Sequence, residues 1–106
     1  MNEQTERISL MEHHLDQAKE AIKQLATAIE QYAESLPAIH ALADYYNSDE
    51  WKKDFSDDEQ GLLPQDLKRG VLSEDGIYNT LDDNLALRMR INEVMRQEDD
   101  YIEEAK

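Results

Sequence analysis

The sequence contains no cysteine, and this absence excludes disulfide bonds, thiol catalysis and thiolate metal ligands. Only three glycines and two prolines occur among 106 residues, too few for a β-rich protein with many tight turns. No apolar run approaches the roughly 18 residues that a membrane span needs, and the polar, acidic N-terminus does not resemble a signal peptide. These absences favour an all-α protein, which we expect to be cytoplasmic and to make no membrane contact.

Positive charge is also scarce, because 11 Lys and Arg stand against 25 Asp and Glu, for a net charge of −14 at pH 7. Such a chain is repelled by phosphates and by anionic lipids, so we expect no direct binding to nucleic acid. The acidic residues are spread through all three thirds of the sequence, with a modest excess in the last. Solubility explains this excess most simply, and an acidic decoy that mimics DNA and inhibits a nucleic-acid-binding protein is the alternative.

The main positive feature of the sequence is an apolar stripe near its start, called here the heptad seam. Its members recur at alternating steps of three and four residues, and they are Ile8, Met11, Leu15, Ala18, Ile22, Leu25, Ile29, Tyr32 and Leu36. Only an α-helix places residues of this spacing on one face, so the seam predicts a helix over about residues 3–35. We expect the last helix of the same chain to cover this face, and pairing of two copies along the heptads is the alternative.

Helix-breaking and capping residues divide the middle of the chain. Pro37 has no amide hydrogen and disfavours a helical residue before it, so we expect the first helix to end or to kink sharply there and a second helix to cover residues 37–46. Ser48 is the predicted N-cap of a short helix over residues 49–56. The polar, acidic stretch that follows, residues 56–61, is predicted to be a loop.

Similar signals place two further helices. Pro64 begins a predicted short helix over residues 64–69, which Gly70 ends in the left-handed conformation. Ser73 is the predicted N-cap of the last helix, which runs over about residues 74–97 and is followed by a fraying end.

Together these elements predict a single all-α domain over residues 1–106, since a chain of this length suffices for one domain and no more. The predicted architecture is a long antiparallel helical hairpin, with the short helices packed at the end where the chain turns, in a small helical bundle. About 40% of the residues are hydrophobic, so we expect a small core of moderate stability.

No motif indicates catalysis or a cofactor. His13 and His14 are adjacent on the first helix and point about 100° apart, so they do not have the three- or four-residue spacing of metal ligands on a helix. The acidic stretch before Gly61 does not match the ligand positions of a calcium-binding EF-hand loop. No nucleophile elbow and no glycine-rich phosphate loop is present. We therefore expect no enzyme activity, no cofactor and no metal.

Aromatic and basic residues are concentrated in the middle of the chain. Most of the aromatic side chains lie there or just after it, namely Tyr45, Tyr46, Trp51, Phe55 and Tyr78. These rings either close one end of the hairpin as a core or present a binding surface. The basic residues near them, among them Lys68 and Arg69, either neutralise nearby acids or bind an anion or carboxylate. The candidate partner-binding surface comprises Tyr46, Trp51, Phe55, Lys68 and Arg69.

The same region carries a resemblance to a known family. The residues that carry it are Tyr45-Tyr46, Glu50-Trp51, Asp54-Phe55, Asp58-Glu59, Leu63-Pro64, the run from Asp66 to Asp75 (Asp-Leu-Lys-Arg-Gly-Val-Leu-Ser-Glu-Asp), Tyr78, Leu81 and Asn84. This pattern resembles a family of small acidic bacterial proteins known only as a domain of unknown function, number four-two-nine-eight. The resemblance extends from Glu6 to about Met95. It implies a bacterial, cytoplasmic, helical protein, and it implies no activity, ligand or site.

The sequence therefore leads to a functional hypothesis of low chemical detail. We expect a non-enzymatic cytoplasmic protein–protein interaction module, whose partner is an unknown protein or a second copy of the chain in a homodimer. The acidic DNA mimic is the alternative.

Overall fold

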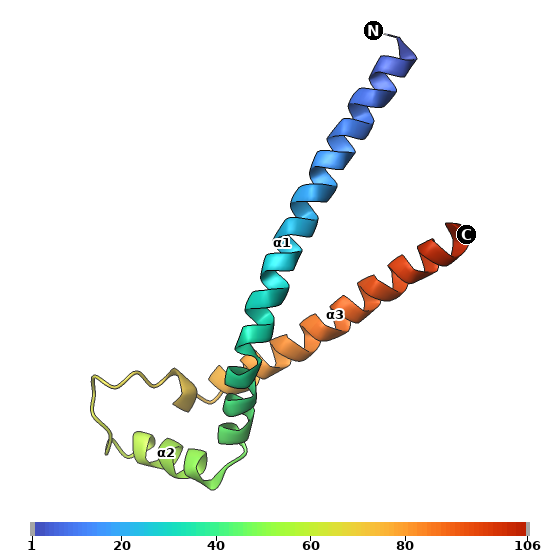
Figure 1. The fold of residues 1–106 in the computed structure, drawn as a ribbon. Helices are drawn as coiled ribbons and strands as arrows, with labels where there is room; N and C mark the ends of the chain where they lie inside the picture. Colours follow the sequence, from blue (N-terminus) through green and yellow to red (C-terminus); the bar gives the residue numbers. More distant parts are fainter. Residues whose placement is uncertain (1, 106) are drawn as a thin grey trace. The chain divides into compact units, whose positions relative to one another are not determined.

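A computed structural model of the chain describes residues 2–105 (Figure 1). These residues form α1 (Glu3–Tyr46), α2 (Asp49–Glu59), the 3-10 helix η1 (Gly70–Leu72) and α3 (Gly76–Ala105), with no strand among them. The prediction of an all-α protein is confirmed. Contacts divide the chain into two units, residues 1–38 and residues 39–106, and each is described by itself.

Unit 1, residues 1–38, consists of the larger part of α1. Its first turn is capped by Asn2, whose side-chain Oδ1 accepts a hydrogen bond from the Thr5 amide at 2.8 Å. Acidic residues in that turn, Glu3 and Glu6, suit the positive end of the helix dipole. No residue of α1 is buried. The large side chains of the heptad seam from Ile8 to Ile29 are exposed.

Helix α1 continues through Pro37 to Tyr46. The prediction that the first helix ends near residue 35 and that a separate helix covers residues 37–46 is therefore wrong. Proline removes only one amide donor, the one that would bond the carbonyl four residues earlier, at a cost of about 3 kcal/mol. Strong helix formers such as Ala33 and Ala38 flank it, and the Ser35 hydroxyl donates to the Tyr32 carbonyl at 2.7 Å within the same turn.

Unit 2, residues 39–106, begins with the last turns of α1 and continues into α2. Ser48 is the N-cap of α2, as predicted, because its Oγ accepts from the Trp51 amide at 3.2 Å. The helix does not stop at residue 56 but extends to Glu59, so the predicted loop begins later than expected.

The end of α2 has the hydrogen bonds of a Schellman motif. The Gly61 amide donates to the Asp58 carbonyl and the Leu62 amide donates to the Asp57 carbonyl, both at 3.0 Å. Gly61 has a φ of 73°, the left-handed conformation that glycine adopts without strain. The prediction assigned this conformation to Gly70, which instead starts η1 and has no positive φ.

Residues 64–69 do not form the predicted short helix. They contain one turn, in which the Leu67 amide donates to the Pro64 carbonyl at 3.3 Å. The Arg69 side chain donates to the Pro64 carbonyl at 2.6 Å, so it takes up an acceptor that a continuing helix would use for one of its own amides.

Helix α3 follows η1 after three residues, 73–75. The Ser73 Oγ accepts from the Gly76 amide at 3.0 Å, so Ser73 caps this helix as predicted, although the regular helix begins two residues later than expected. It extends to Ala105, beyond the predicted end near residue 97, and the expected fraying segment is helical. The extra turns are rich in glutamate and other helix-compatible residues.

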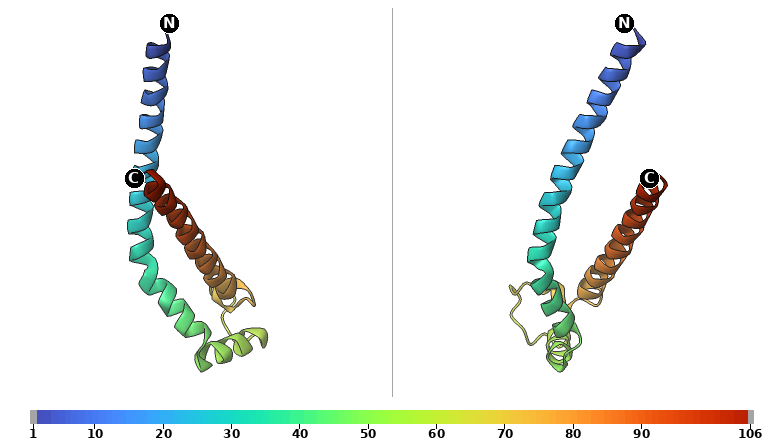
Figure 2. Two further views of the ribbon diagram at one scale, coloured as in Figure 1. Left: turned by 90° about the vertical axis from the view of Figure 1, so that its right-hand side faces the viewer. Right: turned by 45° about the vertical axis from the view of Figure 1, so that its right-hand side comes forward.

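The core of unit 2 is small. Within residues 2–105 only Leu72 of η1 and Ile77 of α3 are buried hydrophobic residues. The 3-10 helix packs against both α2 and α3, and Figure 2 shows the segment after α2 returning to the start of α3. No helix among the described residues is long and apolar enough to cross a membrane.

Candidate interaction surface

Three aromatic rings stack in sequence along one side of unit 2. The rings of Tyr46 and Trp51 meet edge to face, with centroids 4.9 Å apart, and those of Trp51 and Phe55 are stacked at 5.2 Å. The four-residue step from Trp51 to Phe55 places both rings on one face of α2, and the Ser48 cap turns the chain so that Tyr46 reaches them. All three side chains are half-buried. The structure thus brings together the three aromatic members of the predicted surface.

Trp51 also ties α2 to η1. Its indole Nε1–H donates to the Val71 carbonyl at 2.9 Å, across 20 residues of sequence. The indole N–H is donor only, and a half-buried tryptophan needs an acceptor for it. This bond fixes the aromatic rings next to η1.

Tyr45 forms a second link between α1 and α2. Its hydroxyl donates to the Asp54 Oδ2 at 2.6 Å. Burial raises the pKa of the Tyr45 phenol, and the hydrogen bond to Asp54 and the nearby negative charges raise it further, to about 12. Tyr45 therefore stays protonated at neutral pH and acts as a structural donor.

Arg69 connects the segment after α2 to the end of that helix. Its Nη1 pairs with the Asp58 Oδ1 at 2.8 Å, and its Nη2 donates to the Pro64 carbonyl at 2.6 Å. The planar guanidinium can hold a carboxylate and a carbonyl at once, which a lysine cannot do with the same geometry. Arg69 is thus engaged within unit 2, in agreement with the interpretation that this basic residue neutralises a nearby acid.

Lys68 is placed differently from Arg69. It is exposed, and within residues 2–105 it forms no ion pair. It stands at the rim of a hollow of about 430 Å³, lined by Leu42, Lys68, Gly70, Val71, Gly76, Ile77 and Thr80. The lining is apolar apart from the Lys68 amine, the Thr80 hydroxyl and backbone groups, so it suits an apolar group that carries an acceptor or a negative charge.

The close approach of η1 and α3 beside this hollow depends on Gly76. A Cβ at this position would collide with the Gly70 carbonyl oxygen and lie 2.6 Å from the Ser73 Oγ. No signal in the sequence marks Gly76, because the proximity of η1 to the first turn of α3 is visible only in the structure.

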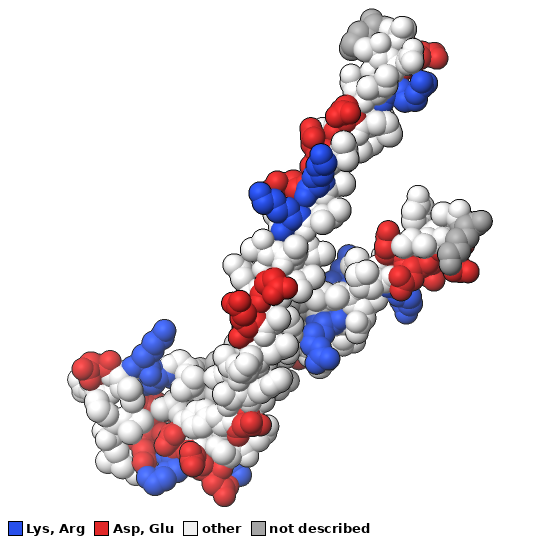
Figure 3. Space-filling model, in the orientation of Figure 1, with Lys and Arg blue, Asp and Glu red and all other residues white. Residues whose placement is uncertain are grey.

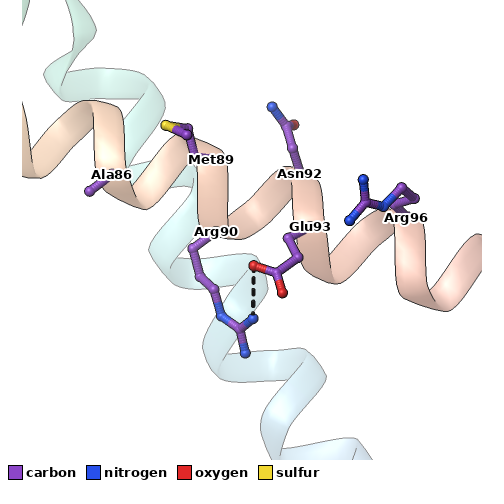
Figure 4. Close-up of a pocket in the computed structure, with 6 residues that line it drawn as sticks. All are labelled: Ala86, Met89, Arg90, Asn92, Glu93 and Arg96. Atoms are coloured by element: carbon purple, nitrogen blue, oxygen red, sulfur yellow. Dashed lines mark ion pairs between the residues drawn. The ribbon is translucent and has the colours of Figure 1, made fainter.

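A second hollow, of about 640 Å³, lies along α3 (Figure 4). Its six lining residues all come from this one helix, and the pair between Arg90 Nη1 and Glu93 Oε2, 3.4 Å apart, crosses it. One helix face cannot enclose a ligand, so this hollow is not a candidate binding site.

Among the residues that the structure describes, no group of three or more His, Asp or Glu is arranged to hold a metal ion. The rings of His13 and His14 lie with centroids 6.1 Å apart and planes 48° apart. On the face shown in Figure 3, acidic side chains are interspersed with basic and uncharged ones.

Sequence comparison places the chain among known families but adds no site. A family model described as Domain of unknown function (DUF4298) matches residues 8–93. No curated protein and no solved structure matches the chain.

Proposed function

We propose that this chain, which belongs to the family described as Domain of unknown function (DUF4298), is a non-enzymatic protein–protein interaction module of the bacterial cytoplasm. The family membership confirms the resemblance drawn from the sequence, and the family description assigns no activity.

One observation supports an interaction module above all. Among the described residues the buried hydrophobic core is two side chains, while α1 and α3 carry exposed large hydrophobic side chains along their length. Apolar surface of this extent on a soluble chain marks a site of interaction, because water solvates it poorly.

The recognition site that we propose lies in unit 2. It comprises the hollow and the three aromatic rings of Tyr46, Trp51 and Phe55. Val71 lines the hollow, and its carbonyl accepts a hydrogen bond from the Trp51 indole, so this residue connects the hollow with the aromatic rings. The partner would place an apolar side chain in the hollow and a carboxylate near Lys68. The hollow's lining contains no carboxylate and no imidazole, which favours binding over catalysis.

Capture of a partner from the native cell tests this proposal. The tagged chain is used as bait and its co-purifying proteins are identified by mass spectrometry, in parallel with Lys68→Glu, Val71→Glu and the control Arg88→Glu. We expect a partner that is lost with both substitutions in the hollow and kept with the control, which changes the same charge on exposed α3. Equal capture by all variants would disprove the site, and a chain that captures nothing would disprove the function.

The DNA-mimic alternative has less support. A decoy of nucleic acid needs carboxylates at phosphate-like spacing on one face, and on the face that Figure 3 draws the acidic side chains are interspersed with basic ones.

A further inference from the structure

We propose that residues 8–25 of two copies of this chain pair as an antiparallel, two-stranded coiled coil. This proposal concerns unit 1 and does not depend on the recognition site of unit 2. It starts from the apolar members of the heptad seam in this segment. The large ones, Ile8, Met11, Leu15, Ile22 and Leu25, are between 46% and 68% exposed.

The spacing of the seam favours another helix as its cover. The steps of three and four average 3.5 residues, which keeps one stripe facing a partner helix along a coiled coil. In heptad terms, Ile8, Leu15 and Ile22 occupy a positions, while Met11, Ala18 and Leu25 occupy d positions.

The charges beside the seam favour pairing with a second copy of the segment that runs in the opposite direction. Glu12 and Lys19 occupy successive e positions, one heptad apart. In an antiparallel pair the e positions of the two helices face each other. When the two copies overlap over residues 8–25, Glu12 of each copy faces Lys19 of the other, which gives two attractive pairs by symmetry. On the opposite flank, His14 faces Ala21, with no pair of like charges.

The sizes of the side chains agree with the same register. Ile8 of one copy lies opposite Leu25 of the other, Met11 opposite Ile22, and Leu15 opposite Ala18, so the small residue meets a large one. In a parallel pair Ala18 would face Ala18 and leave a thin layer in the interface. A parallel pair would keep an attraction between Arg7 and Glu12 but would set His14 against Lys19.

The small size of the interface indicates a weak dimer. Eighteen residues of helix are about 27 Å long. Five large side chains and one alanine from each copy would bury on the order of 1,000 Å² in total, near the lower limit for a specific interface. We therefore expect a dimer that dissociates in the micromolar range and forms at higher concentration.

Charge reversal provides the first test, with the full chain measured by sedimentation equilibrium. Glu12→Lys or Lys19→Glu alone places like charges opposite each other twice and should weaken the dimer about tenfold. The double variant restores two attractive pairs and should return the dissociation constant to within about threefold of the original. Far-UV circular dichroism checks that each variant remains helical.

Spin labels distinguish an antiparallel from a parallel pair of helices. Because the sequence has no cysteine, a single introduced cysteine is the only thiol that a label can modify. Gln17→Cys and Gln31→Cys lie at equivalent heptad positions. In the antiparallel pair the two labels at residue 17 are almost level, whereas those at residue 31 are about 43 Å apart along the axis. A parallel pair gives equal distances at both positions.

The outcomes are decisive in either direction. A concentration-dependent dimer with rescue by the double variant and unequal label distances supports the proposal. A chain that stays monomeric at millimolar concentration, a double variant as weak as the single ones, or equal label distances would each overturn it. A monomer would mean that another part of the chain or a different protein covers the seam.

Discussion

Arg69 is the residue whose replacement should most clearly weaken unit 2. The perturbation is Arg69→Met, which keeps most of the side-chain length and removes the guanidinium. It deletes the ion pair with Asp58 at 2.8 Å and the hydrogen bond to the Pro64 carbonyl at 2.6 Å. The third contact, from Nε to the Leu67 carbonyl at 3.4 Å, is too long to contribute much.

The expected loss follows from these contacts and their exposure. A hydrogen bond to a charged group contributes about 1.5–3 kcal/mol when protected, and an exposed ion pair contributes about 1 kcal/mol or less. The side chains of Arg69 and Asp58 are 35% and 18% exposed, so the pair falls between these limits. Adding the bond to Pro64, we expect Arg69→Met to lower the free energy of unfolding of unit 2 by about 2 kcal/mol.

The single tryptophan provides the assay. Trp51 lies in unit 2, so its fluorescence during urea unfolding reports on this unit alone. With a slope near 1 kcal/mol per molar urea, the midpoint should fall by about 2 M. Arg88→Met on exposed α3 removes the same charge and should change the midpoint by less than 0.5 M. If Arg69→Met and Arg88→Met had the same midpoint, the assignment of Arg69 as a fastening residue would be refuted.

Three further predictions concern unit 2, each measured by tryptophan fluorescence during urea unfolding. The pKa of Tyr45 is raised to about 12, so between pH 10 and pH 12 the unfolded chain loses a proton that the folded chain keeps, and stability should fall by about 1 kcal/mol as the pH rises. Tyr45→Phe should remove this component of the pH dependence, and an unchanged profile would contradict the bond to Asp54. Ser48→Ala should cost about 1 kcal/mol through loss of the N-cap, and no change would mean that the cap is dispensable. Gly76→Ala should destabilise unit 2 by more than 1 kcal/mol because of the collision with the Gly70 carbonyl, whereas Gly70→Ala meets no atom within 4 Å and is the matched control. Equal effects of the two alanine variants would disprove the close approach.

Local signals in the sequence were sufficient for much of the fold. The caps at Ser48 and Ser73 were predictable because a cap bond spans only a few residues. The heptad spacing predicted α1, and the helix runs through the whole seam. Pro37 misled the prediction because its local cost is real, yet the surrounding helix formers outweigh it.

Non-local contacts explain what the sequence could not provide. Gly61 was predicted to lie in a loop, and it is the extension of α2 to Glu59, closed by the Schellman bonds, that makes Gly61 the left-handed residue at a helix end. The bond from Trp51 to Val71 spans 20 residues and has no sequence signature. Among the candidate site residues, the sequence grouped Lys68 with Arg69, whereas the structure fastens Arg69 to Asp58 and leaves Lys68 at the hollow.

The two units are stabilised by different kinds of interaction, and this difference bears on function. Unit 2 holds its small core with specific bonds from Trp51, Tyr45 and Arg69, each of which connects separate segments. In unit 1, the Asn2 and Thr27 side chains form hydrogen bonds with backbone groups three or four residues away, and no residue of α1 is buried. Because most helical stability in proteins comes from packing of an apolar face, the stability of unit 1 depends on what covers the heptad seam. Association through the seam and stabilisation of this helix are therefore one linked equilibrium, in which a second copy of the chain acts as the ligand.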